Sequence, residues 1–497
     1  MFILGLCCTS CGPATSAGAS AGLAAALGGI LKGGVSREPT TGGPDVFIQV
    51  TRIVETTFWD ADKLNPQAFL KGAVGGIEPD LRRQGGNVSQ QGSQMVVVLN
   101  GQTKAIDLSS IKTTADLRSA FADLHSMLLQ YQRGEGKAVN WEYDAIEGIL
   151  KGLDSNSEFM PPHAFREMLE EAKGDYAGIG IRIDLENGEI VFREAMKGSP
   201  ASRAGLNPGD RIVTIDGYPT KGLTLQEAIR RMRGPVGSQM VLGILRPGSA
   251  EPEEIAVTRA KLRIETVESR MLDGHIGYVK VTSFHDTTRQ DAASVLSRLV
   301  QHNKAEALIL DLRNNPGGLL SESVEVCKLF VDNGSLITYT EGRVRNQNAR
   351  YVANGAGLYR HYPLIVLINS RSAAGSEIVA GALQDLQKAR IVGSKSYGQG
   401  SIQTIFPLRD GSGLRLTTAH FFTPTGRNID GVGITPDIDV QNDGKEDRQL
   451  IVAYAILKEA LSPGNRPNSP LTREDASIGT GIREVGREMF AATSVGP

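Results

Sequence analysis

Two nearly continuous apolar runs do most to restrict the folds open to this chain. The first covers residues 307–312, and the second covers residues 364–369. Each run has the length of a buried strand, and each is followed by a tight turn and then by the apolar spacing of a helix. Strands and helices that alternate in this way are typical of an α/β core. We therefore predict a mixed α/β core over residues 262–441, with helices at 319–330 and 379–386.

The length of the chain predicts several domains. Its 497 residues are too many for one hydrophobic core, because single cores stop growing near roughly 250 to 300 residues. We expect an α/β multidomain protein. The other predicted segments are a low-complexity leader at 1–45, a mainly helical N-terminal domain at 46–173, a small strand-rich domain at 174–261, and a C-terminal helix and tail at 442–497.

Within the helical segment we predict one hairpin and interpret the two tryptophans. Residues 95–99 have a strand pattern and are followed by Asn100-Gly101, a favoured hairpin turn. We therefore expect a hairpin there. Trp59 and Trp141 are interpreted as packing anchors rather than as ligand contacts.

The charge balance and the absence of several motifs exclude some classes of function. The chain has 53 basic and 55 acidic side chains, so its charge of -2 provides no general attraction to nucleic acid or acidic lipid. No run reaches the roughly 20 apolar residues of an internal membrane span. No His-Glu-x-x-His, paired Cys-x-x-Cys or phosphate-loop segment occurs. We expect no metal and no cofactor.

The first 35 residues differ from the rest of the chain. A short apolar stretch at 2–8 is followed by many Ala, Gly and Ser residues, which predicts an export leader and a place outside the cytoplasm. Cys7, Cys8 and Cys11 leave an N-terminal lipid anchor as an alternative. The remaining cysteine, Cys327, lies in an apolar helical pattern and is expected to be a lone buried thiol.

The segment 174–261 combines short strands with one clearly delimited helix. Thr224 and Glu227 form a capping-box pattern at the start of this helix, and Gly234-Pro235 ends it. A small strand-rich domain with one helix beside a groove can bind an extended peptide as an added strand. This combination predicts a peptide-binding domain.

Three stretches of this segment resemble a PDZ domain: 176–181, 198–206 and 208–212. In that family, the glycine-containing loop before the second strand turns backbone N–H groups toward the terminal carboxylate of a peptide. The resemblance implies that protein or peptide C-terminal tails are the partners. The peptide-binding residues that it implies are Tyr176, Ala177, Gly178, Ile179 and Gly180.

The loop after the first apolar run has a composition that suits a catalytic centre. It reads Asn-Asn-Pro-Gly-Gly over residues 314–318 and opens a helix at the carboxyl end of a strand. Glycine amides in such a place present unpaired donors, which can stabilise an oxyanion formed from a peptide carbonyl.

Further motifs extend this pattern across the core and resemble the C-terminal processing peptidases, or tail-specific proteases. The likeness spans residues 143–440, and its most specific segments are 311–318, 417–427 and 433–437. The resemblance implies a serine endopeptidase with a Ser-Lys dyad and an assisting Gln, acting outside the cytoplasm on proteins with apolar C-terminal tails. It also implies an oxyanion hole at the backbone of Gly318 and Gly375.

Both dyad positions are substituted in this chain. The family pattern Ser-Ala-Ser-Ala-Ser-Glu aligns with residues 372–377, where the attacking position holds Ala374. The family's Gly-Lys-Gly aligns with residues 398–400, where the lysine position holds Gln399, and the assisting Gln is retained as Gln403. An alanine methyl cannot attack a carbonyl, and a neutral amide cannot accept a serine proton. We therefore predict a pseudoprotease that binds tails as a scaffold or regulator.

The alternative prediction is an active serine endopeptidase that uses displaced residues. Ser370, Lys395 and Gln399 reproduce the family's spacing four residues upstream, and Ser372 or Ser376 could act with Lys395 after a rearrangement. A four-residue displacement moves groups by several ångströms, which catalysis does not tolerate. The sequence leaves open whether the substitutions are natural or engineered, and it is compatible with a homo-oligomer.

Overall fold

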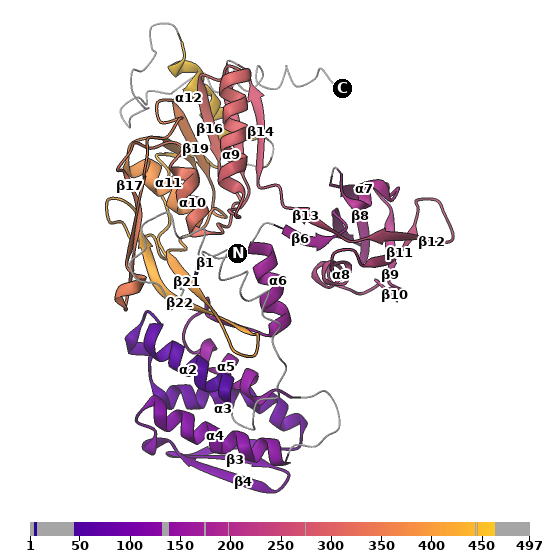
Figure 1. Ribbon diagram of the computed structural model, residues 1–497, viewed down its shortest axis with the longest axis vertical. Helices are drawn as coiled ribbons and strands as arrows, with labels where there is room; N and C mark the ends of the chain where they lie inside the picture. Colours follow the sequence, from indigo (N-terminus) through magenta and orange to yellow (C-terminus); the bar gives the residue numbers. More distant parts are fainter. Residues whose placement is uncertain are drawn as a thin grey trace. The chain divides into compact units, whose positions relative to one another are not determined.

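The computed structural model divides into two compact units, residues 168–265 and the rest of the chain. It describes residues 4–6, 44–131, 139–172, 175–196, 198–273, 275–442, 444 and 446–462 (Figure 1). Most of the predicted leader, with Cys7, Cys8 and Cys11, and the predicted tail beyond 462 lie outside these residues. The domain boundaries expected from the sequence stay predictions, because this division separates only two units.

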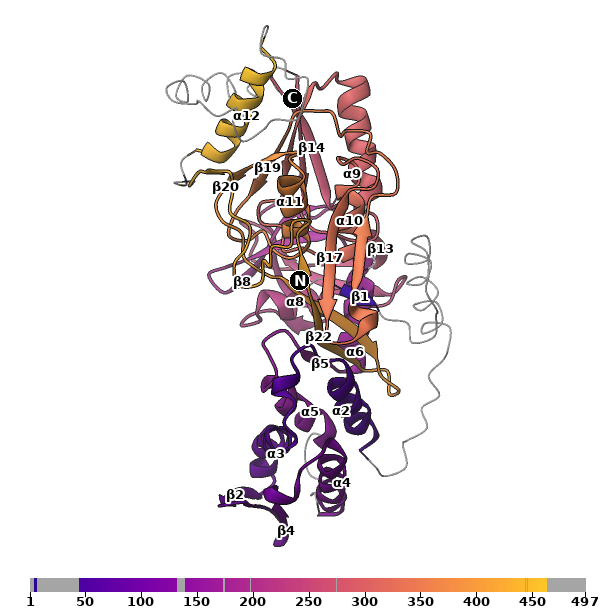
Figure 2. The same ribbon diagram turned by 90° about the vertical axis from the view of Figure 1, so that its left-hand side faces the viewer.

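The N-terminal part of the larger unit is a helical bundle with a small antiparallel sheet (Figure 2). The predicted hairpin turn forms, with positive φ angles at both Asn100 and Gly101. Trp141 is 1% exposed and is a packing anchor, whereas Trp59 is 37% exposed and packs edge-on against the His420 ring, with 4.4 Å between the ring centroids. The elements are α2 (Asp45–Thr57), η1 (Ala61–Lys63), α3 (Pro66–Arg83), β2 (Asn87–Gln91), β3 (Gln94–Leu99), β4 (Gln102–Asp107), η2 (Leu108–Ser110), α4 (Thr114–Tyr131) and α5 (Trp141–Lys151).

Helices α3 and α5 approach each other closely because glycines meet at their contact. A side chain at Gly76 would overlap the backbone carbonyl of Asp144, and one at Gly148 would overlap the carbonyl of Gly72. The apolar faces of both helices are buried in one cluster with α2 and α4.

The core of the larger unit is a mixed sheet with helices on both faces (Figure 1). Four parallel pairings join its strands in the order β14-β15-β16-β19-β20-β23, and only β14 is antiparallel. The strands are β14 (Val267–Leu272), β15 (Ile276–Val281), β16 (Ala307–Asp311), β19 (Leu364–Ile368), β20 (Arg390–Gly393) and β23 (Ile438–Asp439). The helices are α9 (Thr288–Ser297), η3 (Arg298–His302), α10 (Leu320–Cys327), α11 (Gly375–Asp385) and α12 (Arg448–Ala460).

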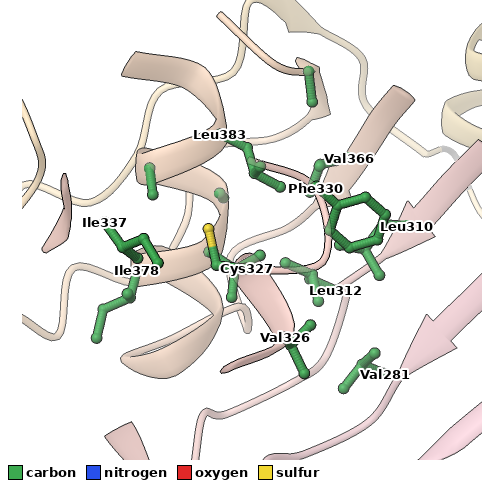
Figure 3. Close-up of a cluster of buried hydrophobic side chains, with 14 of the residues drawn as sticks. Val281, Leu310, Leu312, Val326, Cys327, Phe330, Ile337, Val366, Ile378 and Leu383 are labelled. Carbon is green, nitrogen blue, oxygen red and sulfur yellow. The ribbon is translucent and has the colours of Figure 1, made fainter. Parts of the chain in front are cut away.

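The two predicted apolar runs are the central strands β16 and β19, and their side chains alternate between the two faces. Leu308 and Leu310 pack with α9, α10 and α11, whereas Ala307 and Ile309 pack with α12. Cys327 lies inside the first cluster as a buried free thiol, as predicted (Figure 3). Burial raises the pKa of this thiol to about 12, so it stays protonated.

A second sheet of the larger unit lies beside α11 and carries Gln403 on its strand β21 (Figure 2). Its strands follow the order β1-β21-β22-β17-β18, and β5 pairs with β22. Strand β1 runs parallel to β21, with Leu4 opposite Gln403. The elements are β1 (Leu4–Leu6), β5 (Glu158–Met160), α6 (Pro162–Ala172), β17 (Leu336–Gly342), η4 (Arg345–Gln347), β18 (Ala349–Val352), β21 (Ser401–Pro407) and β22 (Gly413–Phe422).

The smaller unit is strand-rich, as expected for a PDZ domain. The Thr224 N–H donates to Glu227 Oε2 over 2.8 Å, so the predicted capping box is present at the start of α8. The elements are β6 (Asp175–Gly178), β7 (Ile181–Glu186), β8 (Glu189–Ala195), α7 (Pro200–Arg203), β9 (Arg211–Ile215), β10 (Tyr218–Pro219), α8 (Leu225–Met232), β11 (Gln239–Leu245), β12 (Glu253–Thr258) and β13 (Ala260–Arg263). In the described part of the chain, no helix has the length and apolar character needed to cross a membrane.

Candidate active site

The loops that follow β16 and β19 meet at Ala374. A Cβ atom placed on Gly317 would lie 2.8 Å from the Ala374 Cβ, so the glycine loop passes directly beside this residue. Asn315 joins the two loops, because its carbonyl accepts from the Ala373 N–H over 3.0 Å and from Ser376 Oγ over 2.8 Å. The parallel sheet thus brings together two segments that are more than fifty residues apart in the sequence.

Ala374 has a backbone conformation that alanine rarely adopts. Its φ is +53° and its ψ is -109°, and helix α11 begins at the next residue. Such a conformation costs on the order of 1–3 kcal/mol and persists only where the surroundings impose it. A sharp strand-to-helix turn of this kind is how hydrolases present a nucleophile. The backbone therefore has the shape of a nucleophile-bearing turn, although the side chain is only a methyl group.

Gly318 and Gly375 provide two backbone donors next to this turn. Gly317 and Leu319 hydrogen-bond to the Phe284 backbone, with Phe284 N–H donating to the Gly317 carbonyl and Leu319 N–H donating to the Phe284 carbonyl. The Gly318 N–H takes no part in these two hydrogen bonds. Within the described residues, neither the Gly318 N–H nor the Gly375 N–H has an acceptor. The pair has the character that the predicted oxyanion hole requires.

The backbone of Gln399 lies close to the backbone of Ala374, because both donate to the same acceptor. The N–H groups of Ala374 and Gln399 both donate to Glu377 Oε2, each over 2.8 Å. The Gln399 side chain is 9% exposed, and its Nε2 is buried without an acceptor in the described part of the chain.

Gln403 is fully buried four residues further along. Its Nε2 donates to Ser401 Oγ over 3.0 Å and to Thr417 Oγ1 over 3.4 Å. Its Oε1 has no donor among the described residues. Each of the two glutamine side chains therefore has one buried amide atom whose hydrogen-bonding capacity is unused.

Glu377 holds the turn and the Gln399 loop together. Besides the two contacts above, its carboxylate accepts from Ser396 Oγ over 2.5 Å and from the Gly398 N–H over 2.7 Å. Burial raises the pKa of Glu377, and the four donors oppose that rise. Sequence reasoning assigned no role to Glu377 or to Asn315, although both lie inside the quoted family segments. The signal for Glu377 was its place three residues after Ala374, where an acidic side chain caps a helix.

The serines of the alternative prediction have structural hydrogen bonds. Ser372 Oγ donates to the Leu312 carbonyl over 2.8 Å, and Ser376 Oγ donates to the Asn315 carbonyl. Both side chains are fully buried. Ser370 and Lys395, in contrast, are exposed. These contacts do not favour a rearranged catalytic group.

The smaller unit has a groove of about 260 Å³ between strand β7 and helix α8. Gly178, Ile179 and Gly180 line it, together with Ile229 and Met232 of α8. Tyr176 and Ala177 lie instead on β6, where their backbone pairs with Leu262 and Lys261 of β13. The structure therefore places three of the five predicted peptide-binding residues in the groove.

Comparison with known proteins agrees with this architecture. Peptidase family S41 matches residues 275–440, and a PDZ domain matches residues 191–246. The chain is 40% identical to a carboxy-terminal-processing protease of Bartonella bacilliformis over 301 residues. The matched region covers 60% of this chain and 69% of that protein. It is 37% identical over 330 residues to a carboxyl-terminal-processing protease of Synechocystis, with 65% and 74% covered.

A solved structure of a photosystem II D1 C-terminal processing protease is 25% identical, covers 86% of this chain and 100% of that chain, and has a TM-score of 0.45. The identity to the two curated relatives, the matched peptidase core and the PDZ domain lead to one conclusion: the chain belongs to the carboxy-terminal-processing protease family, within peptidase family S41.

Proposed function

We propose that this member of the family binds the C-terminal tails of proteins and does not hydrolyse them. The observation that carries the proposal is the methyl group of Ala374 at the strained turn beside Gly318 and Gly375. The backbone that would orient a nucleophile is present, and the nucleophile is not. We further propose a role as a scaffold or regulator outside the cytoplasm, in the periplasm or cell envelope.

The two substitutions affect the same catalytic step, the attack of a deprotonated hydroxyl on the peptide carbonyl. A hydroxyl attacks a carbonyl efficiently only when a base removes its proton, and lysine performs this task when desolvation lowers its pKa. Gln399 stays neutral and cannot act as that base. Removing the nucleophile of a serine protease costs about six orders of magnitude in turnover, and removing the base as well adds little. Turnover by this chain should therefore be about six orders of magnitude below that of a serine protease with its catalytic residues intact.

Tail binding is supported by the groove of the smaller unit. Gly180 has a φ of +76°, and a side chain there would overlap Ser199, so the loop before β7 requires glycine. Ile229 on α8 is 36% exposed and lies in the groove wall, where it can contact an apolar side chain. An extended peptide that adds to β7 would place its terminal carboxylate at the loop amides.

The test compares the unaltered chain with a variant that carries Ala374→Ser and Gln399→Lys. Each is incubated with an unstructured protein that ends in an apolar tail, and fragments are identified by mass spectrometry. We expect binding without fragments for the unaltered chain and fragments for the double variant. A single Ala374→Ser variant, which has the hydroxyl but no base, is the matched control and should stay near the unaltered level.

Cleavage by the unaltered chain would contradict the proposal. If Ser372→Ala, Ser376→Ala or Lys395→Ala abolished that cleavage, the active-protease alternative would hold instead. Binding that survives Ile229→Asp would separately contradict the assignment of the tail to the PDZ groove.

A further inference from the structure

The second sheet has an outer face that takes no part in the candidate active site. Phe421 of β22 points inward, because it is fully buried in the apolar cluster that includes helix α11. Side chains alternate along a strand, so His420 and Phe422 point to the opposite face. On the neighbouring strand β17, Glu341 lies opposite His420, and Tyr339 lies opposite Phe422 (Figure 2). The outer face therefore presents aromatic rings next to a carboxylate.

This face is hollowed by two neighbouring cavities. The first, called the Trp59 pocket, has a volume of about 380 Å³, and its aromatic walls are Trp59, His420 and Phe422. The second has a volume of about 740 Å³ and extends along β17 and β18 past Tyr339. Glu341 lines both cavities. A side chain that enters the Trp59 pocket can therefore meet Glu341 while the chain that carries it lies in the larger cavity.

Trp59 is held in place as a wall of its pocket and is still accessible. Its backbone N–H donates to the Thr417 carbonyl over 3.2 Å, and its ring packs against the His420 ring. More than a third of its surface is nevertheless exposed, at 37%. Among the aromatic side chains, an indole attracts cations most strongly. The pocket thus offers an ordered indole to a ligand.

Two carboxylates add negative charge to the Trp59 pocket. Asp430 Oδ1 accepts from the Gly400 N–H over 2.9 Å, and Asp430 Oδ2 lies 3.3 Å from His420 Nε2. The contact with His420 lowers the pKa of Asp430, so this carboxylate is ionised at neutral pH. Glu341 is exposed and has neither a hydrogen-bond nor an ion-pair partner among the described residues. The pocket therefore has a carboxylate without a counterion.

Two arginines near Glu341 are engaged elsewhere. Arg343 also lines the Trp59 pocket, but its Nε donates to the Phe58 carbonyl over 2.8 Å and its Nη2 to the Glu55 carbonyl over 2.6 Å. These carbonyls lie at the C-terminal end of α2, which has a partial negative charge. Arg350 lies over an aromatic ring of β17, 5.6 Å from the ring centroid. Neither arginine is paired with Glu341 in the described structure.

We propose that the Trp59 pocket binds the side chain of a lysine or arginine from a protein segment that crosses the outer face of the second sheet. The alkyl stem packs against Trp59 and Phe422, and the cationic group reaches the Glu341 carboxylate. Charge complementarity selects this occupant, because an acidic side chain would be repelled by Glu341 and Asp430. The inference goes beyond the proposed function, since it involves neither cleavage nor the groove of the smaller unit.

The experiment uses the full chain at pH 7.5 and three seven-residue alanine peptides whose central residue is lysine, norleucine or glutamate. All are N-acetylated and end in a carboxamide, which removes the group that a PDZ loop recognises. Affinities are measured by isothermal titration calorimetry. We expect the lysine peptide to bind at least fivefold more tightly than the norleucine peptide, and the glutamate peptide not to bind.

Tryptophan fluorescence reports where the lysine peptide binds. Trp141 is 1% exposed, so a ligand in the pocket changes mainly the emission of Trp59. We expect this change to saturate with the dissociation constant that calorimetry gives. An emission spectrum that stays the same at saturation would contradict the assignment to this pocket.

Glu341→Gln tests the charge argument with nearly the same shape. We expect it to weaken binding of the lysine peptide at least fivefold and to leave the norleucine peptide unaffected. The matched control is Glu268→Gln, at an exposed glutamate on β14 of the other sheet, which should change neither affinity. Trp59→Leu removes the indole and should also weaken binding of the lysine peptide.

Three results would overturn the inference. The first is equal binding of the lysine and norleucine peptides, and the second is equal binding of the lysine peptide by the unaltered chain and Glu341→Gln. The third is butylammonium that binds as tightly as the lysine peptide, because the occupant would then be a free amine. If Trp59→Leu does not fold, as judged by thermal melting, Glu341→Gln decides. Failure of the proposed function has a different sign, which is cleavage of an apolar-tailed protein.

Discussion

Single residues determine whether the loops around Ala374 can approach one another. Gly318 has a φ of +143°, and a Cβ atom on it would overlap the Phe284 carbonyl oxygen. Gly375 has an equally tight neighbour, because a Cβ atom there would overlap Ser323 Oγ. Glycine at these two positions is thus required by packing, independently of any role of their N–H groups.

Gly318→Ala should destabilise the chain by about 2 kcal/mol or more, because strained backbone and overlap with main-chain atoms add. Gly334→Ala is the matched control, since Gly334 also has a positive φ, +80°, but has open space around it. The control should lose only about 1–2 kcal/mol. Urea unfolding measures both, and equal losses would show that the approach to Phe284 is unimportant.

For single residues, the sequence predicted the positions that align with the family's reacting groups, but not the residues that hold those positions in place. Ala374, Gln399 and Gln403 were identified because each aligns with a residue of stated role. Glu377 was not assigned a role, because three of its four donors lie in one loop 19 to 22 residues further along the chain, and a single sequence does not show that this loop returns to Glu377.

Individual elements are joined by buried polar contacts. Helix α12 is attached to the end of β16 by Arg313, which donates to Asp311 Oδ2 over 2.6 Å and to Asp447 Oδ2 over 2.9 Å. Asp311 is 1% exposed, and it also accepts from the Tyr278 hydroxyl. The family segment that begins at Asp311 therefore anchors a helix as well as the glycine loop.

Arg313→Leu should destabilise the chain by about 3–5 kcal/mol, because it leaves the Asp311 carboxylate buried without its cation. The double variant Arg313→Leu, Asp311→Leu removes both charges and should recover a large part of that loss. Both are measured by urea unfolding against the unaltered chain. A loss below about 1 kcal/mol for the single variant would mean that the pair does not hold α12.

Helices α9 and α10 are joined by Glu322, which accepts from the Arg289 N–H over 2.9 Å. Burial raises the pKa of Glu322 from its ordinary 4.5 to about 7. The folded state therefore binds the proton more tightly than the unfolded state does, so this group's contribution to stability decreases as the pH rises from about 4.5 to 7.

Glu322→Gln removes this titrating group and with it the loss of stability as the pH rises. The variant should gain stability relative to the unaltered chain as the pH increases through this window, and the difference should level off above it. Unfolding free energies measured from pH 4.5 to 8 provide the test. A difference that is constant with pH, or that shrinks as the pH rises, would contradict the assignment of Glu322.

The elements that apolar patterns and capping residues predicted one by one are present, and their ends show why some details could not be predicted. The predicted strands 307–312 and 364–369 form as β16 and β19, because a short continuous apolar run bounded by turns is typical of a strand buried on both faces. Helix α11 was expected at 379–386 but starts at Gly375, since the Glu377 carboxylate caps the turn before it. The capping box at Thr224 was predicted correctly because all of its atoms lie within four residues.

The whole molecule combines a core that matches peptidase family S41 with a PDZ domain in one chain. The α/β multidomain class was predicted correctly from length and from alternating apolar patterns. The close contact of α3 with α5 and the second sheet around β21 were not predicted, because they depend on pairings between distant segments. Local patterns contain little information about such pairings.

The central claim is that the peptidase core has lost its nucleophile while keeping the surroundings of one. Covalent labelling tests it most directly. The unaltered chain and the Ala374→Ser, Gln399→Lys variant are treated with a fluorophosphonate and mapped by peptide mass spectrometry. We predict an adduct on residue 374 of the variant and no adduct within residues 369–377 of the unaltered chain. An adduct on Ser370, Ser372 or Ser376 of the unaltered chain would contradict the account.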